Sequence, residues 1–389
     1  MHSVVVGGGI AGLALAVELS RLGWRSTIVE ARYPGAGNSS RNVGRIRRMQ
    51  LTADLTEFSC RAADKWMRVD AVTGRRNPLL YATRYVWVLY GDDEHAVVEP
   101  LQPMWDEHGA RARVVDARAV LDAVPVLEGG EPPVGGVIGD AAIVDHDAAL
   151  YAYYLYAREA GVRFEIGDPV AGIETSGGRA CGATLRNGRS VPGEIVVNAA
   201  GGRSWEIAAL AGLDVPNRPI RREALVTDPS RPFMSPAVTF YRPQEGWFNQ
   251  TLRGELVAGV TDPDEPFGMT EESSPRFLAR TARVVLDKAP QLAGLRVIRQ
   301  WAGVYDTTPD KRPLVGEHQD LPGFFALNGW SGRGMLLAPY AAELLAREIA
   351  GRERDPLLAP FGPNRFRGRA AEPSAPSDYY TGYAHEEER

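Results

Sequence analysis

A glycine turn between a β-branched segment and an apolar helix dominates the first thirty residues of the chain. Residues 3–6 (SVVV) are followed by GGGIAG at residues 7–12, and apolar residues then recur at helical spacing as far as Gly23. A second strand-like run at residues 26–30 ends in an acid, Glu30. This order of strand, glycine turn, helix, strand and acid is typical of the unit that binds the pyrophosphate of a dinucleotide.

Each glycine of the turn has its own expected role. Gly7 permits the tight turn, Gly9 lets backbone N–H groups approach a pyrophosphate, and Gly12 lets the helix pack against the sheet. The helix N-terminus adds partial positive charge for the phosphates. Glu30 is placed to accept hydrogen bonds from an adenosine ribose, which favours FAD or NAD over NADP; a purely structural βαβ turn is the alternative.

Similar signals recur in two later parts of the chain, with strand-rich segments between them. A buried strand at residues 194–200 runs into a glycine turn, and a third glycine-rich turn at residues 329–334 opens an apolar helix. We therefore expect an α/β fold in which a Rossmann-like dinucleotide-binding domain, built from discontinuous segments, is joined to an antiparallel-sheet α+β substrate domain. The expected cofactor domain comprises residues 1–80, 140–215 and 300–366, the substrate domain residues 81–139 and 216–299, and a disordered tail residues 367–389.

Local patterns predict three further elements. Residues 52–69 are amphipathic and predict a helix, and residues 148–160 predict a second helix that follows the capping segment Asp145-His146-Asp147. Residues 81–100 alternate in strand fashion. We take that change of pattern as the entry into the substrate domain.

The composition excludes several classes of protein. The chain of 389 residues has a formal net charge of -5, so it lacks the basic stripe of a nucleic-acid-binding surface. Its 2 cysteines have no CxxC spacing and its 6 histidines form no HExxH motif, so we expect neither a disulfide nor a metal site. No stretch reaches the roughly 18 apolar residues that span a bilayer, and the apolar N-terminus lacks the basic region of a secretion signal. A cytoplasmic protein with no membrane partner is the expectation.

Four motifs, taken in order, resemble those of the D-amino-acid oxidase, sarcosine oxidase and glycine oxidase family of FAD-dependent enzymes. They are the loop at residues 7–12 with Glu30, VNAAG at 197–201, WAGVYDTTPD at 301–310, and GWSGRGM at 329–335. The resemblance covers nearly the whole chain up to about residue 366. In the family the last loop turns backbone N–H groups toward the flavin pyrimidine ring, where a helix N-terminus stabilises the negative charge of the reduced flavin.

The resemblance implies that FAD is the cofactor and assigns its contacts to the glycine turns, the residues around the ribose acid, an arginine segment and the second FAD strand. These contacts fall on Gly7, Gly9, Ile10, Ala11, Gly12, Glu30, Ala31, Arg32, Arg45, Val170, Ala200, Gly201, Gly332, Gly334 and Met335.

The resemblance also implies a substrate site. Arg45 and Arg48 fall on two arginines of the family, of which one contacts the flavin and the other anchors a substrate carboxylate, and we assign the anchor to Arg48. A guanidinium suits this role because it grips a carboxylate through two parallel hydrogen bonds. Tyr305 falls on a position that lines the pocket, and Arg333 replaces a loop histidine. The alternatives are solvated or phosphate-binding arginines and a tyrosine that packs in the core.

Three departures from the family pattern change what it implies. Gly303 stands near the cysteine that attaches flavin covalently in one branch, so FAD is expected to be non-covalent. Val257 stands near the lysine that promotes the reaction with oxygen, so a dehydrogenase with another electron acceptor is an alternative to an oxidase. Leu336 stands near a second carboxylate-binding lysine, so the carboxylate site is expected to be built differently, with Arg333 as a candidate.

The function implied is FAD-dependent oxidation of the C–N bond of an amino acid or secondary amine to an imine, with hydride transfer to flavin N5. One alternative is oxidation of a C–O bond, as in a 2-hydroxy acid or glycerol phosphate. Another is a non-catalytic FAD-binding subunit in which Trp87, Trp247 and Tyr241 form an interface.

Overall fold

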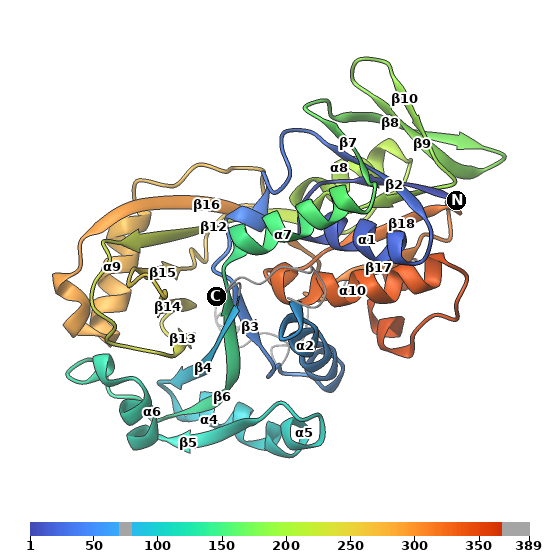
Figure 1. The fold of residues 1–389 in the computed structure, drawn as a ribbon. Helices are drawn as coiled ribbons and strands as arrows, with labels where there is room; N and C mark the ends of the chain where they lie inside the picture. Colours follow the sequence, from blue (N-terminus) through green and yellow to red (C-terminus); the bar gives the residue numbers. More distant parts are fainter. Residues whose placement is uncertain (70–79, 368–389) are drawn as a thin grey trace.

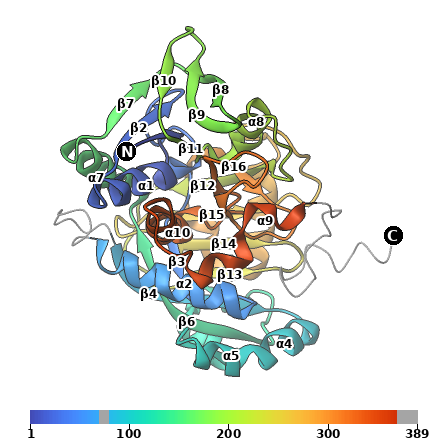
Figure 2. The same ribbon diagram turned by 90° about the vertical axis from the view of Figure 1, so that its right-hand side faces the viewer.

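The computed structural model describes residues 1–69 and 80–367, which form two large sheets with helices packed around them (Figures 1 and 2). The expected tail at residues 367–389 lies outside the described residues, except for Arg367. Within the described ranges, no helix is long and apolar enough to cross a membrane, and no group of three or more His, Cys, Asp or Glu side chains is arranged to hold a metal ion.

The first sheet has six strands and contains the N-terminus of the chain. All neighbouring strands are parallel except the first pair, β17 and β18. In order across the sheet, the strands are β17 (Leu314–Glu317), β18 (Phe324–Asn328), β11 (Ile195–Asn198), β1 (His2–Val6), β2 (Arg25–Glu30) and β7 (Arg163–Ile166). Three segments of the chain that are far apart in sequence therefore meet in one sheet, as the recurring glycine motifs predict.

Different layers cover the two faces of this sheet, because alternate residues of its buried strands point to opposite sides. Val5, Ile28 and Val197 pack on the helical side, whereas Val4 and Val196 pack on the other. The helical layer comprises α1 (Ile10–Arg21), α2 (Ala53–Trp66), α7 (His146–Glu159) and α10 (Gly334–Ile349). The other layer comprises β8 (Val170–Ser176), β9 (Arg179–Leu185), β10 (Ser190–Pro192) and α8 (Ser204–Leu210).

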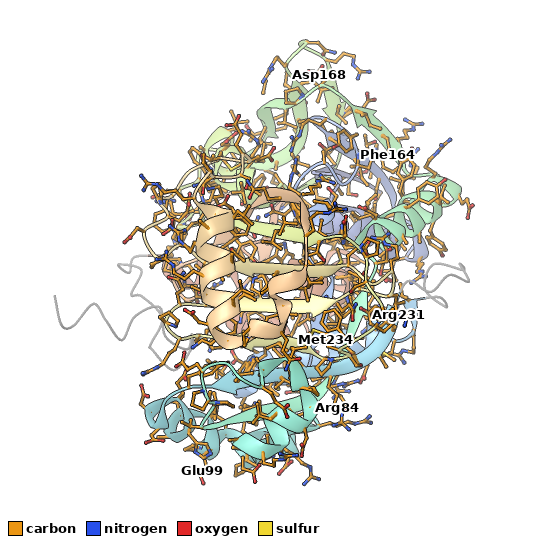
Figure 3. All side chains as sticks on the ribbon, turned by 90° about the vertical axis from the view of Figure 1, so that its left-hand side faces the viewer. Arg84, Glu99, Phe164, Asp168, Arg231 and Met234 are labelled. Carbon is orange, nitrogen blue, oxygen red and sulfur yellow. The ribbon has the colours of Figure 1, made fainter. Side chains whose placement is uncertain are left out.

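The second sheet has nine mainly antiparallel strands. In order, they are β16 (Val297–Thr307), β12 (Arg218–Thr227), β15 (Leu256–Val260), β14 (Gly246–Gln250), β13 (Ala237–Phe240), β4 (Leu80–Leu89), β6 (Gly135–Val144) and β3 (Arg45–Arg47), with β5 (Ala112–Asp116) paired to β6. Helix α9 (Phe277–Lys288) lies across one face, and Figure 3 shows it in front of the strands, with Phe164 and Asp168 at one end of the molecule and Arg84 and Glu99 at the other. Strand β3 belongs to residues 1–80, which we expect in the cofactor domain, yet it pairs within this second sheet. The expected domain boundaries therefore stay a prediction.

Short helices complete the described chain. The α-helices are α4 (Asp92–Val98), α5 (Gln102–Glu107) and α6 (Ala117–Ala123). The 3-10 helices are η1 (Asn38–Ser40), η2 (Glu99–Leu101), η3 (Pro125–Leu127), η4 (Gly201–Arg203), η5 (Pro290–Gly294), η6 (Pro356–Phe361) and η7 (Pro363–Phe366).

Two predicted helices are confirmed and one predicted strand is too long. Helix α2 lies within residues 52–69, and Asp145 caps α7 by accepting a hydrogen bond from the backbone N–H of Ala148 at 3.0 Å. The strand expected over residues 81–100 ends at Leu89, and residues 92–98 are helical. Three acids in the first turn of α4 favour this helix, because they complement its N-terminal partial charge.

A buried ion network joins three helices of the first layer. The Nζ of Lys65 on α2 lies 2.6 Å from a carboxylate oxygen of Glu18 on α1 and 2.6 Å from one of Glu343 on α10. Lys65 is only 5% exposed, so its charge depends on both acids for compensation. Burial raises the pKa of the Glu343 carboxyl, but the hydrogen bond and charge of Lys65 outweigh burial and hold it below its usual value.

We expect Lys65→Met to lower the free energy of unfolding by about 2–3 kcal/mol, because it removes the buried cation that joins Glu18 to Glu343 and leaves each acid with only a more exposed arginine, Arg21 or Arg347. Thermal or urea unfolding of the full chain measures this. Arg61→Met on the same helix is the matched control: Arg61 is 60% exposed and 3.8 Å from Glu57, so its loss should cost no more than about 1 kcal/mol. Equal losses in the two variants would show that the network is not stabilising.

Candidate functional site

The first glycine turn is packed too closely for any side chain. Gly7 has a φ of +111°, and a Cβ there would lie 2.5 Å from the backbone oxygen of Ala199. A Cβ on Gly12 would lie 2.0 Å from the backbone oxygen of Gly7. Helix α1 begins at Ile10, and its N-cap residue, Gly9, has no side chain to accept a hydrogen bond from the first turn. Backbone N–H groups of this first turn are therefore available to an anion.

Glu30 is held in place by backbone donors at the end of β2. Its Oε2 accepts a hydrogen bond from the N–H of Gly8 at 2.8 Å, and its Oε1 accepts one from the N–H of Arg32 at 2.8 Å. The side chain of Arg32 pairs with Glu271, and Ala31 is exposed. Ser39, which was not predicted, accepts from the N–H of Ile10 at 3.0 Å and adds a hydroxyl at the start of α1.

The other two glycine turns follow the strands next to β1. Strand β11 pairs with β1 and ends before Ala200 and Gly201, while β18 pairs with β11 and ends before Gly329. Because these strands are parallel, the three turns share the carboxyl edge of the sheet, where ligands bind in open α/β sheets. Val170 instead starts β8 in the three-stranded layer.

The third turn is built around Asp306 and Tyr305 of β16. The carboxylate of Asp306 accepts a hydrogen bond from the N–H of Gly329 at 2.7 Å, and the N–H of Ser331 donates to the backbone oxygen of Asp306 at 3.1 Å. Gly332 has a φ of +85°, and a Cβ there would lie 2.4 Å from the Tyr305 ring. Helix α10 begins at Gly334, again without a side-chain cap among the described residues, and Met335 is buried at its first turn.

Asp306 is buried, and in the described part of the chain it has no cationic partner. It is 4% exposed, and burial raises the pKa of its carboxyl to about 7, although hydrogen bonds from the backbone N–H groups of Trp330 and Gly329 oppose the shift. Its sequence position within YDTTPD did not reveal this role, because a buried acid is distinguished from a solvated one only by its packing.

The side chains of residues 45–48 point in different directions, because successive residues of a strand face opposite sides of its sheet. Arg45 and Arg47 of β3 point to one face, and Ile46 points to the opposite face, into the core of the helical layer. Arg48, just beyond β3, lies 2.5 Å from Asp64 and 3.4 Å from the backbone oxygen of Cys60, both on α2. The predicted carboxylate anchor is therefore engaged with a helix, whereas Arg47, which was not singled out, shares a face with Arg45.

Arg45 crosses the concave face of the nine-stranded sheet. Its Nε donates to Asn249 at 3.0 Å and its Nη1 to Thr239 at 3.0 Å, on strands separated from β3 by others in the sheet order. The guanidinium also lies 4.8 Å from the Trp247 ring centre. These contacts require the sheet to curl. Val257 is directly opposite Asn249 in the β14–β15 pair, so the position expected for an oxygen-promoting lysine shares this face.

Register places Arg222 beside Tyr305. Tyr305 is opposite Ile220 and Gly303 is opposite Arg222, and residues directly opposite in an antiparallel pair share a face. The Arg222 guanidinium lies 5.7 Å from the Tyr305 ring centre. The third turn, Tyr305 and Arg222 therefore lie on the sheet face that Val257 and Asn249 share, and Arg45 bonds to Asn249 on that face. Arg333, by contrast, donates from Nη2 to the backbone oxygen of Lys311.

The electrostatic character of this face shows in Tyr85. The Nη1 of Arg47 lies 3.2 Å from the Tyr85 hydroxyl, and the guanidinium groups of Arg47 and Arg45 lie 5.3 and 5.7 Å from its ring centre. Burial disfavours the phenolate, but the two positive charges outweigh it and lower the pKa of Tyr85 below its usual value. The face therefore favours anions.

Two of the three aromatic residues considered as an interface are buried. Trp87 is 2% and Tyr241 is 7% exposed, and their rings pack edge to face at 6.1 Å. Trp247 stacks on Arg45. Burial of Trp87 and Tyr241 in the core disfavours the alternative in which these residues form an interface, whereas Trp247 is half-buried on the face of Arg45.

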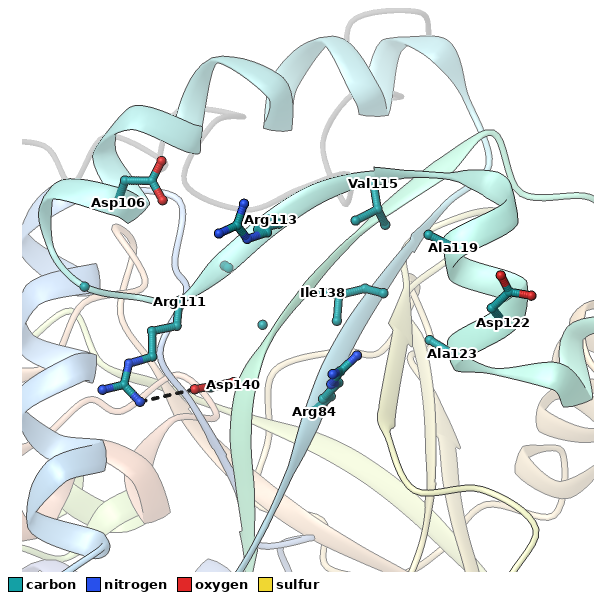
Figure 4. Close-up of a pocket in the computed structure, with 13 residues that line it drawn as sticks. Arg84, Asp106, Arg111, Arg113, Val115, Ala119, Asp122, Ala123, Ile138 and Asp140 are labelled. Carbon is teal, nitrogen blue, oxygen red and sulfur yellow. Dashed lines mark hydrogen bonds and ion pairs between the residues drawn. The ribbon is translucent and has the colours of Figure 1, made fainter.

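Two hollows lie elsewhere on the molecule. One of about 810 Å³ is lined by Arg84, Arg113 and Ile138 (Figure 4). Arg84 alternates with Tyr85 along β4, so this hollow opens on the sheet face opposite the arginine surface. Another, of about 470 Å³, lies between Trp205 and Phe267. Neither contains the glycine turns.

Comparisons with known proteins agree with this geometry. The sequence pattern of the DAO family, described as FAD dependent oxidoreductase, matches residues 2–348. Sarcosine oxidase subunit beta from Rhodobacter capsulatus is 26% identical over 373 residues, covering 94% of this chain and 88% of that protein. Glycine oxidase from Pseudomonas aeruginosa is 25% identical over 373 residues, covering 92% and 98%. The crystal structure of L-proline dehydrogenase from P. horikoshii has a TM-score of 0.87 at 26% identity, covering 95% of this chain and 98% of that one.

The described residues fit FAD. Two helix N-termini whose N-cap residues form no side-chain cap, those of α1 and α10, face one sheet edge from either side of the second glycine turn. Gly7 and Gly12 leave no room for side chains that would block approach to the backbone, and Glu30 is fixed at the end of β2. A dinucleotide needs this combination of backbone donors and a ribose acid.

We expect Asp306→Asn to stabilise the protein more at pH 8 than at pH 5, relative to the unchanged chain. A carboxyl whose folded pKa is raised to about 7 loses stability as pH rises from about 4 to 7, and up to about 4 kcal/mol of this penalty is absent in the amide. Melting temperatures at the two pH values measure the difference. An effect of Asp306→Asn that is independent of pH would show that Asp306 titrates normally.

Proposed function

Because the chain belongs to the DAO family of FAD-dependent oxidoreductases, we propose that its concave face binds an amino acid or secondary amine whose C–N bond is oxidised to an imine. The family match and the names of the relatives confirm the expected α/β flavoprotein fold, FAD as cofactor and the class of amine-oxidising enzymes. The observation that supports the choice of face is that the turn at Gly332 packs on Tyr305, which lies beside Arg222 and near enough to Arg45 of β3 for their charges to interact.

We propose that FAD is held at the carboxyl edge of the six-stranded sheet by the predicted set of glycines and Glu30. Bound FAD supplies the acceptor for the two electrons that leave the substrate C–H bond. The attachment is proposed to be non-covalent, since Gly303 has no nucleophile and a Cβ there would lie 2.9 Å from Asn38 Oδ1. Even a cysteine would need the loop at Asn38 to move.

We assign the substrate carboxylate to Arg47 in place of Arg48. Arg47 faces the concave side with Tyr85 beneath it, whereas Arg48 points to α2, where it pairs with Asp64. A guanidinium grips a carboxylate through two parallel hydrogen bonds, which orients the carbon next to it. Tyr305 forms the side of the pocket, and Arg333 supports the flavin-facing turn. No general base is required, because an amine that binds unprotonated supplies the electron pair that forms the imine.

The proposed function also includes the electron acceptor that reoxidises the enzyme, a partner subunit and a cellular location. Val257 offers no positive charge to oxygen, so we propose that an acceptor other than oxygen reoxidises the enzyme faster. The name sarcosine oxidase subunit beta implies an assembly, and we propose that this chain also works beside another subunit while keeping its own active site. A cytoplasmic location is proposed, in line with two cysteines that form no disulfide.

Anaerobic mixing of the FAD-loaded protein with a panel of amino acids and secondary amines should bleach the flavin absorbance. The rate should rise toward alkaline pH as the amine loses its proton. Reoxidation should then be slower in air-saturated buffer than with an artificial acceptor dye. Stopped-flow absorbance measures both half-reactions.

The same experiment separates the alternatives. Bleaching by 2-hydroxy acids or glycerol phosphate but not by amines would assign the site to C–O oxidation. Absence of bleaching by every compound would leave a non-catalytic FAD-binding subunit. Oxygen that reacts as fast as the dye would show that another cation replaces the lysine missing at Val257.

Arg47→Met should raise KM for a carboxylated amine by roughly 30-fold or more while FAD stays bound, because truncating one partner of a desolvated ion pair costs about 2–5 kcal/mol. Arg48→Met is the matched comparison and should leave KM nearly unchanged. Steady-state kinetics with a carboxylated amine and its decarboxylated analogue measure the effect. If Arg48→Met raises KM and Arg47→Met does not, the original assignment to Arg48 is restored.

A further inference from the structure

The concave face carries more positive charge than one carboxylate requires. Arg47 suffices for a single substrate carboxylate, yet Arg45 and Arg222 lie on the same face. Arg45 is near enough to both Tyr85 and Tyr305 for their charges to interact. Two guanidinium groups beyond Arg47 therefore border the space next to Tyr305.

Arg45 is poised for an additional acceptor. Its Nε and Nη1 are bonded to Asn249 and Thr239, which are neutral, while its Nη2 is fully buried and has no hydrogen-bond partner among the described residues. Within the same residues it forms no ion pair, and burial lowers its pKa, although the charge and hydrogen bonding of the Tyr85 hydroxyl oppose the shift. A guanidinium remains charged in proteins, so an enclosed donor of this kind costs free energy until an anion reaches it.

Arg222 differs from the arginine next to it. Arg221 points to the opposite face and lies 2.8 Å from the carboxylate of Glu265. In the described part of the chain, Arg222 makes no ion pair; its Nη1 donates to the backbone oxygen of Arg221 at 2.9 Å. Glu245 is the acid whose negative charge opposes the lowering of the Tyr85 pKa. Its carboxylate accepts a hydrogen bond from the Thr261 hydroxyl at 3.2 Å. The positive charge beside Tyr305 is thus left for a ligand.

We propose that the substrate carries two carboxylates, and that Arg45, assisted by Arg222, binds the second one beside Tyr305 while Arg47 binds the first. The substrate class is an amino dicarboxylate, including secondary amines whose nitrogen joins two carbons that each bear a carboxylate. This inference rests on the proposed function and narrows its substrate. The resemblance assigns Arg45 to the flavin instead, and the experiment below distinguishes the two roles.

Binding of matched thioethers to the FAD-loaded protein tests the proposal without turnover. Thiodiacetate and (methylthio)acetate differ by one carboxylate, and sulfur in place of nitrogen prevents imine formation. Perturbation of the flavin absorbance gives each dissociation constant. We expect thiodiacetate to bind at least about tenfold more tightly, the range of a hydrogen bond between charged groups. Iminodiacetate should likewise bleach the flavin at lower concentration than N-methylglycine.

Three variants assign the preference. Arg45→Met should reduce the tenfold ratio to near unity with FAD retained, and Arg222→Met should reduce it in part. Arg84→Met is the matched control, because Arg84 alternates with Tyr85 along β4 and therefore lies on the opposite face of the same sheet, so this variant should leave the ratio unchanged. If Arg45→Met cannot be purified, the ratio of the two thioether dissociation constants in the unchanged protein and in Arg222→Met still tests whether a second carboxylate is bound.

Each contrary outcome has a distinct meaning. Equal binding of the two thioethers, with bleaching by monocarboxylate amines, overturns the second carboxylate and leaves the proposed function standing. Loss of FAD from Arg45→Met with an unchanged ratio in Arg222→Met returns Arg45 to the flavin and overturns the inference. If no amine bleaches the flavin and neither thioether perturbs it, the proposed function fails and the inference fails with it.

Discussion

The close approach of the backbone at Gly7 is the constraint on which the rest of the structure depends. Only a glycine can hold a φ of +111° with its α-carbon against the backbone of Ala199. That contact ties the turn after β1 to the turn after β11, and the parallel pairing of β11 with β18 adds the turn before α10. Two helix N-termini are thereby aligned along one sheet edge, which makes a site for an extended, anionic cofactor.

The curl of the second sheet is the complementary constraint. A flat sheet would keep β3 far from β14, but the bonds from Arg45 to Thr239 and Asn249 bridge the concave side. The apolar face of the same strands packs against α9, so hydrophobic burial stabilises one side while polar residues occupy the other. This division places charged side chains beside the turn that we propose faces the flavin, without exposing the core.

The two constraints meet at Tyr305. Its ring packs where a side chain on Gly332 would otherwise lie, and Arg222 flanks it. The next residue, Asp306, holds the same turn through the N–H of Gly329. One strand, β16, thus connects the cofactor edge of the first sheet to the arginine surface of the second, and this connection explains why a segment of ordinary strand character carries so much of the site.

The sequence by itself determined the cofactor half of the protein. The glycines, Glu30, the turn after β11 and the entry to α10 were predictable because they are local requirements of backbone geometry, visible as residue types at fixed spacing. The choice among the arginines for the proposed substrate site depended only on tertiary structure. Arg48 and Arg47 are neighbours in sequence, and whether a side chain faces α2 or the concave sheet depends on the phase of a three-residue strand. The partners of Arg45 and the burial of Asp306 arise from strands and turns far apart in the chain, so no local pattern encodes them.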